Sequence, residues 1–149
     1  MGIIKLNKDN VKEANELLTK LIHDEKQYDD NINLEYIVNN YYENMIDKDN
    51  CYLAFIIDNN IIMGYIYGFI QDNGNAYINK IIQLDALYIK EEYRNKGYAK
   101  LLIDSLKKWS IQKGIKNIEL KVCNNNQNAI NLYHQYGFKD TKTIMKLDI

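Results

Sequence analysis

LYIKEEYRNKGYAKLL, residues 87–102, joins an apolar strand to an amphipathic helix through a turn that contains Gly97. The turn also contains Arg94, the only arginine in the chain, together with Lys96. The first backbone N–H groups of a helix lack intrahelical acceptors, and the helix dipole favours negative charge beside them. Glycine allows the backbone to approach a ligand closely, because it has no Cβ. The stretch therefore predicts a site for a pyrophosphate group.

The composition limits the classes of protein and partner to consider. The chain has 149 residues, of which 46% are hydrophobic and 26% charged, and its net charge is −1. These values are ordinary for one globular domain over residues 1–149, and they argue against binding to nucleic acid or to an anionic membrane. The start of the chain has no signal-peptide pattern, and the isolated Cys51 and Cys123 lack metal-ligand spacing. We expect a cytoplasmic protein that holds no metal.

Hydrophobic periodicity and turn residues predict a series of eleven elements. Helices are expected over residues 7–22, 34–46, 98–113 and 127–137. Strands are expected over residues 2–6, 51–57, 61–70, 76–89, 118–123, 138–140 and 143–147. The resulting order is β-α-α-β-β-β-α-β-α-β-β. Antiparallel hairpins followed by one β-α-β crossover predict an α/β fold with a central mixed sheet and helices on both faces.

A second motif lies downstream of the first. NQNAINLYHQYGF, residues 126–138, begins with a good helix N-cap and ends with the Gly137-Phe138 pair. Together, the two stretches resemble the signatures of the Gcn5-related N-acetyltransferase family, [Arg/Gln]-x-x-Gly-x-[Gly/Ala] followed by Asn-x-x-Ala-x-x-x-Tyr and Gly-Phe. Ala99 stands where many members of the family have a second glycine, and Glu91 stands where proline is frequent.

The resemblance implies that acetyl-CoA is the cosubstrate. Its pyrophosphate would lie on the turn, and its pantetheine arm would run along the preceding strand. The implied cofactor contacts are Leu87, Tyr88, Ile89, Arg94, Asn95, Lys96, Gly97, Tyr98, Ala99, Asn126 and Tyr133. Several of these residues have simpler interpretations: Arg94 could form a surface salt bridge where the helix starts, Gly97 could be an ordinary turn glycine, and Asn126 could act only as a helix cap.

The resemblance also implies direct transfer of an acetyl group to an amine. Tyr133 would donate a hydrogen bond or a proton to the departing CoA thiolate. It also lies on an apolar helix face, so a purely packing role is an alternative. Asp85 is the only carboxylate on the long strand and is the candidate general base. The alternatives are a water chain as the base and an ordinary strand aspartate paired with a lysine.

The acceptor is less well defined by the sequence. Residues 23–30 contain four acidic residues against one lysine, which would attract a cationic acceptor unless this stretch is only a solvated loop. A polyamine, an aminoglycoside, an amino-acid-like amine or a peptide amine all fit. Numerous tyrosines suit an apolar or aromatic amine as well. The resemblance leaves open a homodimer, and it leaves open an acyl-CoA-binding sensor without turnover as the alternative to an enzyme.

Overall fold

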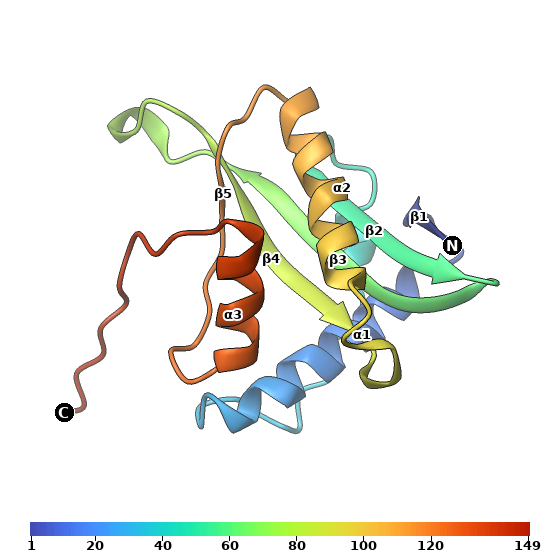
Figure 1. Ribbon diagram of the computed structural model, residues 1–149, viewed down its shortest axis with the longest axis horizontal. Coiled ribbons are helices and arrows are strands. Elements are labelled where there is room, and N and C mark those ends of the chain that lie inside the picture. Colours follow the sequence, from blue (N-terminus) through green and yellow to red (C-terminus); the bar gives the residue numbers. More distant parts are fainter.

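The computed structural model describes residues 1–149 (Figure 1). Its strands are β1 (Gly2–Lys5), β2 (Cys51–Asp58), β3 (Ile61–Gln71), β4 (Ile81–Ile89) and β5 (Ile118–Glu119). Its α-helices are α1 (Val11–Asp24), α2 (Tyr98–Gln112) and α3 (Gln127–Tyr136). Short 3-10 helices are η1 (Glu25–Gln27), η2 (Tyr42–Asn44), η3 (Gly74–Ala76) and η4 (Glu91–Tyr93).

The five strands form one mixed sheet in the order β1-β2-β3-β4-β5. Neighbouring strands are antiparallel except for β4 and β5, which are parallel. The parallel pairing is short and joins only Ile82 to Ile118 and Gln83 to Glu119. Beyond Gln83, strand β4 therefore continues to Ile89 with no strand on the side that β5 occupies.

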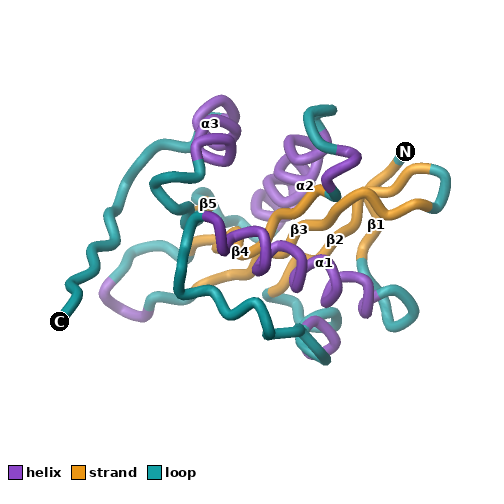
Figure 2. Tube along the Cα trace, turned by 90° about the horizontal axis from the view of Figure 1, so that it is seen from below, coloured by secondary structure: helices purple, strands orange, loops and turns teal.

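Helices cover both faces of the sheet, which confirms the predicted mixed α/β architecture (Figure 2). The face that carries α2 buries Ile56 and Ile82 against Leu102 and Leu106, and α3 packs at the border of the same cluster. The opposite face buries Phe55 and other residues against α1. Strands buried on both faces need apolar side chains at successive positions, as the run LAFI at residues 53–56 illustrates.

A β-bulge interrupts the register between β3 and β4. Ala86 pairs with Tyr67 and Leu84 pairs with Gly68, so that Asp85 has no partner on β3. Side chains alternate strictly along a regular strand. Here Leu84 belongs to the core on the α2 side, whereas Ala86 belongs to the core on the α1 side. The extra residue thus exchanges the faces of all later β4 positions and directs the Asp85 backbone out of the ladder.

The expected helix over residues 34–46 is wrong. Only the 3-10 turn η2 forms there, and Asn40 has a left-handed φ of 54°. Side chains of α1 supply the acceptors that a helix would have supplied, since Thr19 Oγ1 accepts from the Val38 N–H at 3.0 Å and Asn15 Oδ1 accepts from the Tyr42 N–H at 3.1 Å. The segment therefore lies against α1 as irregular chain with its buried N–H groups satisfied.

The Tyr42 side chain anchors this segment in the core. Its ring is fully buried, and its hydroxyl is 2.9 Å from the hydroxyl of Tyr65 on β3. The two rings are arranged edge to face, with centroids 5.6 Å apart. This long-range contact fixes one tyrosine, while the neighbouring apolar residues Leu34 and Ile37 are exposed.

The two strands expected at the end of the chain are also wrong. Residues 138–149 form no strand, and four apolar side chains of this segment are at least 74% exposed: Ile144, Met145, Leu147 and Ile149. In Figure 1 the segment leads away from the sheet. Alternating apolar residues favour a strand only where a neighbouring edge accepts them, and β5 ends at Glu119 rather than at the expected residue 123. Strand β4 likewise begins at Ile81, not at residue 76. None of the helices combines the length and apolarity needed to cross a bilayer.

Candidate active site

The loop between β4 and α2 carries a run of free backbone donors. Asn95 and Gly97 both have left-handed backbones, with φ of 63° and 83°. From Asn95 to Lys100 no N–H donates to an acceptor of the protein, whereas the N–H of Leu101 already bonds to the Gly97 carbonyl oxygen at 3.3 Å. Successive N–H groups in such a turn, at the N-terminus of a helix, form a concave site suited to an anion.

Gly97 is needed for its backbone conformation and not for packing. A Cβ at this position would meet no atom within 4 Å, so no neighbouring side chain excludes a larger residue. The left-handed φ of 83° is what disfavours a larger residue, because this backbone conformation strains residues that carry a Cβ. The space above the free N–H groups therefore stays open to a ligand.

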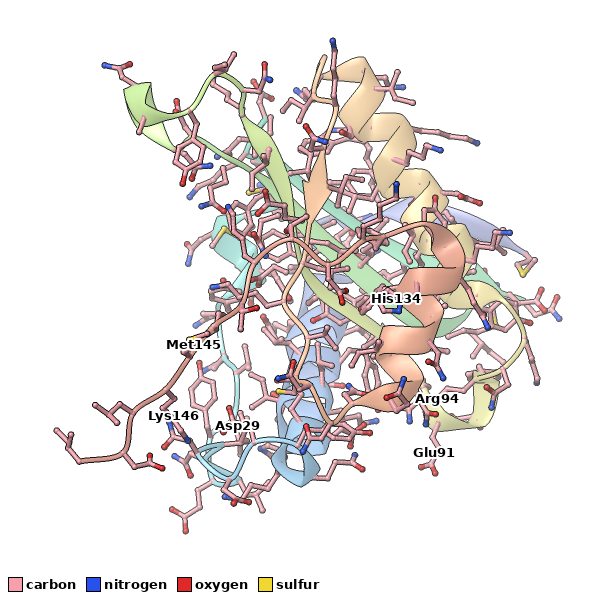
Figure 3. All side chains as sticks on the ribbon, turned by 60° about the vertical axis from the view of Figure 1, so that its left-hand side comes forward. Asp29, Glu91, Arg94, His134, Met145 and Lys146 are labelled. Carbon is pink, nitrogen blue, oxygen red and sulfur yellow. The ribbon has the colours of Figure 1, made fainter.

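Arg94 turns back toward the body of the protein (Figure 3). Its Nε donates to the carbonyl oxygen of Ile89 at 2.8 Å, and an Nη donates to Oδ2 of Asp24 at 3.2 Å. Its guanidinium carbon lies 5.3 Å from the centre of the Tyr88 ring. The contacts are those of the salt-bridge alternative, and they join the loop to the end of β4 and to the end of α1. A contribution of the Arg94 charge to phosphate binding stays a prediction, as does that of Lys96, whose Nζ lies 5.8 Å from the centre of the Tyr93 ring.

Strand β4 offers a free edge directly before this loop. Leu87, Tyr88 and Ile89 pair with β3 on one side, and β5 does not extend far enough to cover the other side. An extended ligand with amide groups could pair with backbone groups at such an edge. The geometry therefore brings the proposed pantetheine strand and the free N–H groups of the loop into one continuous surface.

Helix α3 places Tyr133 at the border of the core on the α2 side. Asn126 caps the helix, since its Oδ1 accepts from the Ala129 N–H at 3.2 Å. The Tyr133 ring packs edge to face on Phe138, with centroids 5.6 Å apart. Burial, with a smaller effect of the negative charge of Glu25, raises the pKa of the Tyr133 hydroxyl to about 12. The hydroxyl is thus protonated at neutral pH and available as a donor. The ring has the packing role that the sequence left open, and its chemical role stays a prediction.

A cavity of about 300 Å³ lies between α1 and the bulge of β4. Six of its eight lining residues are hydrophobic, and the other two are the carboxylic acids Glu25 and Asp85. Loss of hydration among these side chains raises the pKa of Asp85, against the opposing effect of Lys121. Burial also raises the pKa of Glu25, as do the neighbouring charges of Asp29 and Asp85.

A second cavity, of about 420 Å³, shares Asp85 with the first. It is more polar, and Gln71, Asn73 and Gln83 contribute amide side chains to its lining. Lys121 and Lys142 also border it. The unpaired bulge residue Asp85 thus stands where two cavities meet, one apolar and acidic, the other rich in amides and lysines.

Comparison with known proteins decides the family. The family model described as "Acetyltransferase (GNAT) family" matches residues 15–138. The chain belongs to the GNAT acetyltransferase family. Streptothricin acetyltransferase from Escherichia coli is 33% identical over 93 residues, which are 62% of this chain and 49% of that protein. The chain spans between 24% and 49% of the lengths of the first relatives that it matches.

Two solved structures share the fold over nearly the whole chain. The tetramutant of the BH1408 protein from Bacillus halodurans superposes with a TM-score of 0.88 at 18% identity, covering 100% of both chains. The aminoglycoside N-acetyltransferase AAC(6')-Iy, solved in complex with CoA, superposes with a TM-score of 0.73 at 17% identity, covering 99% of this chain and 98% of that chain. At these identities, the likeness shows a common fold.

The sequence did not single out every residue that lines the first cavity. Of the acidic stretch before residue 30, only Glu25 lines the first cavity, while Asp24 is paired with Arg94 and Asp29 is exposed. Tyr41, in the segment expected to be a helix, lines the same cavity. No local pattern distinguishes Glu25 from its acidic neighbours. Its role depends on where α1 ends relative to β4, which is a property of the fold.

Proposed function

We propose that the protein transfers an acetyl group from acetyl-CoA directly to a primary amine. The run of free N–H groups from Asn95 to Lys100 carries this proposal, because it adjoins the free edge of β4, which leads to Asp85. The named relatives support it, since one is a streptothricin acetyltransferase and another is an L-ornithine N5-acetyltransferase from Arabidopsis thaliana. The acceptor would be a small-molecule amine or a peptide amine.

Acetyl-CoA is a substrate in this proposal, and the residues present suit it. The pyrophosphate would accept hydrogen bonds from the N–H groups of residues 95–99, with Lys96 adding positive charge. The pantetheine arm would pair with the backbone of residues 87–89 along the free edge of β4. Asn126, at the start of α3, would lie beside that arm while it caps the helix.

The acceptor must become nucleophilic before it attacks. An alkylammonium ion has no lone pair, and a free alkyl amine titrates near ~10. Asp85 would take the proton, directly or through water: one N–H bond breaks, the electron pair stays on nitrogen, and an O–H bond forms on the carboxylate. The raised pKa of Asp85 makes it a better proton acceptor than an ordinary aspartate.

Attack would join the amine nitrogen to the carbonyl carbon of the thioester. The backbone N–H of Leu87 or Tyr88 would stabilise the negative charge that develops on oxygen. When the C–S bond breaks, Tyr133 would give its proton to the thiolate and would regain one from the nitrogen through solvent. The nitrogen then carries one acetyl group, and Asp85 returns its proton to water. No acyl-enzyme is needed.

A thiol-release assay tests the proposal. Purified protein is mixed with acetyl-CoA and each member of a panel of primary amines, and free CoA thiol and acetylated amine are both quantified. We expect equal amounts of the two products with at least one amine, and little thiol without amine. Tight binding of acetyl-CoA with no acetylated product from any amine would instead support the sensor alternative.

A further inference from the structure

The lining of the first cavity combines apolar walls with two acids. Its walls come mainly from α1 and from the segment before η2: Leu18, Leu21, Ile22, Tyr36, Val38 and Tyr41. Glu25, in the 3-10 turn that follows α1, and Asp85, at the bulge of β4, add the only charged side chains. Two chain segments far apart in sequence thus bring two carboxyl groups to one small space.

Neither carboxyl group has a basic partner within ion-pair distance. The salt bridges of the protein involve other acids: Asp58, Asp72, Asp24, Asp140 and Glu119. The charged groups that act on Glu25 are Asp29 and Asp85, both negative, and only Lys121 acts on Asp85 with the opposite sign. Arg94, the only arginine of the chain, is already bound to Asp24. Glu25 is half-buried and Asp85 is exposed at the bulge, and their like charges raise each other's cost. A cation brought by a ligand would relieve this repulsion.

We propose that this cavity takes a short, unbranched aliphatic primary amine whose ammonium group is held between Glu25 and Asp85. The inference rests on the proposed function and names the substrate class for it. A volume of about 300 Å³ is at the lower end of the range for small-molecule sites. It holds an alkyl chain of a few carbons, and it is too small to enclose a molecule of several rings. The methylene groups would contact Leu18, Leu21 and Val38, while Glu25 selects for the charged end.

A series of straight-chain alkylamines of increasing length tests the apolar part of the site. Each additional buried methylene should raise kcat/KM about fourfold until the cavity is full, after which kcat/KM should fall. A multi-ring aminoglycoside serves as a large acceptor, and a straight-chain amino acid without a side-chain amine serves as an acceptor that carries a carboxylate next to its amine. A best acceptor of either kind, or no dependence on chain length, would overturn the proposal.

The matched variants Glu25→Gln and Glu16→Gln test the acidic part. Glu16 is exposed on α1 and does not line the cavity, so the same chemical change there is a control. Glu25→Gln should lower kcat/KM for alkylamines by roughly ten- to hundredfold, the effect of losing one hydrogen bond to a charged group. Affinity for acetyl-CoA should be unchanged, and Glu16→Gln should match the wild type. Equal kcat/KM in Glu25→Gln and the wild type would overturn the role of Glu25.

Calorimetric titration of alkylamines into the wild-type protein saturated with CoA separates this inference from the proposed function. Binding that weakens in Glu25→Gln supports the cavity assignment even if no amine is acetylated, in which case the proposed function fails alone. Turnover of other amines without any binding of alkylamines overturns the cavity assignment and leaves the proposed function intact. Absence of both binding and turnover overturns both.

Discussion

Replacing Arg94 by alanine should destabilise the protein, because the side chain connects three elements. The variant loses the hydrogen bond from Nε to the Ile89 carbonyl at 2.8 Å and the contact with Asp24 at 3.2 Å. A hydrogen bond from a charged group contributes about 1.5–3 kcal/mol. The ion pair adds little, at most about 1 kcal/mol, because its two side chains are 42% and 48% exposed. We expect a total loss of about 1.5–4 kcal/mol in the free energy of unfolding.

Two measurements check this prediction. Thermal unfolding of Arg94→Ala should show a midpoint lower by roughly 3–16 °C, given the usual shift per kcal/mol for a protein of this size. Titration with CoA should show weaker binding, since the loop that presents the free N–H groups is less firmly held. Lys96→Ala is the matched control, because it removes one positive charge from the same loop without removing a hydrogen bond to the protein.

The outcome separates a structural role from a purely electrostatic one. If Arg94→Ala unfolds at the wild-type temperature and only CoA affinity falls, the guanidinium serves the phosphate and the contacts with Ile89 and Asp24 contribute nothing. If both Arg94→Ala and Lys96→Ala lose the same affinity and neither loses stability, the loop needs only charge. Either result would refute the reasoning from the observed contacts.

Three further predictions concern the cofactor turn and the two chemical groups. Gly97→Ala and its control Gly114→Ala introduce the same strain into open space at opposite ends of α2, so both should lose about 1–2 kcal/mol of stability; only Gly97→Ala should also lose CoA affinity in a titration, and equal affinities would argue against the pyrophosphate site. Tyr133→Phe should lower kcat roughly 10²-fold or more in the thiol-release assay with the fold intact, and an unchanged kcat would leave the residue a packing role only. The raised pKa of Asp85 means that folding binds its proton, so this group's contribution to stability falls as pH rises from its unfolded pKa of about 3.9 through the raised value. Asp85→Asn should therefore unfold at a higher temperature than wild type near about pH 7 and at the same temperature near about pH 3; an equal difference at both pH values would contradict the shift.

Local sequence predicted the parts of the site that local backbone chemistry determines. The turn at Gly97 and the helix cap at Asn126 both follow from the preferences of single residues, and the structure has both features. The mixed sheet followed from the order of hydrophobic segments. The turn and the cap depend on neighbours within a few residues, so a linear pattern contains them.

Features that depend on distant residues were not predicted. The bulge at Asp85 is a property of the register between β3 and β4, and no pattern within β4 alone shows that one residue lacks a partner. The segment before η2 is irregular because Asn15 and Thr19 on α1 accept its N–H groups. The contact of Arg94 with Asp24 joins residues 70 positions apart. In each case the feature depends on residues that lie far apart in the sequence.

The bond between Arg94 and Asp24 has a consequence for the order of events during turnover. Asp24 is directly followed in the chain by Glu25, which lines the first cavity. The Arg94 side chain therefore connects the turn before α2 with the acidic lining of that cavity. On the proposed assignment, acetyl-CoA bound at the turn before α2 would also hold Glu25 in place. The two substrates then influence each other's affinity, and thermodynamic linkage makes that influence equal in both directions. On this assignment, an amine would bind more tightly to a protein that has already bound acetyl-CoA.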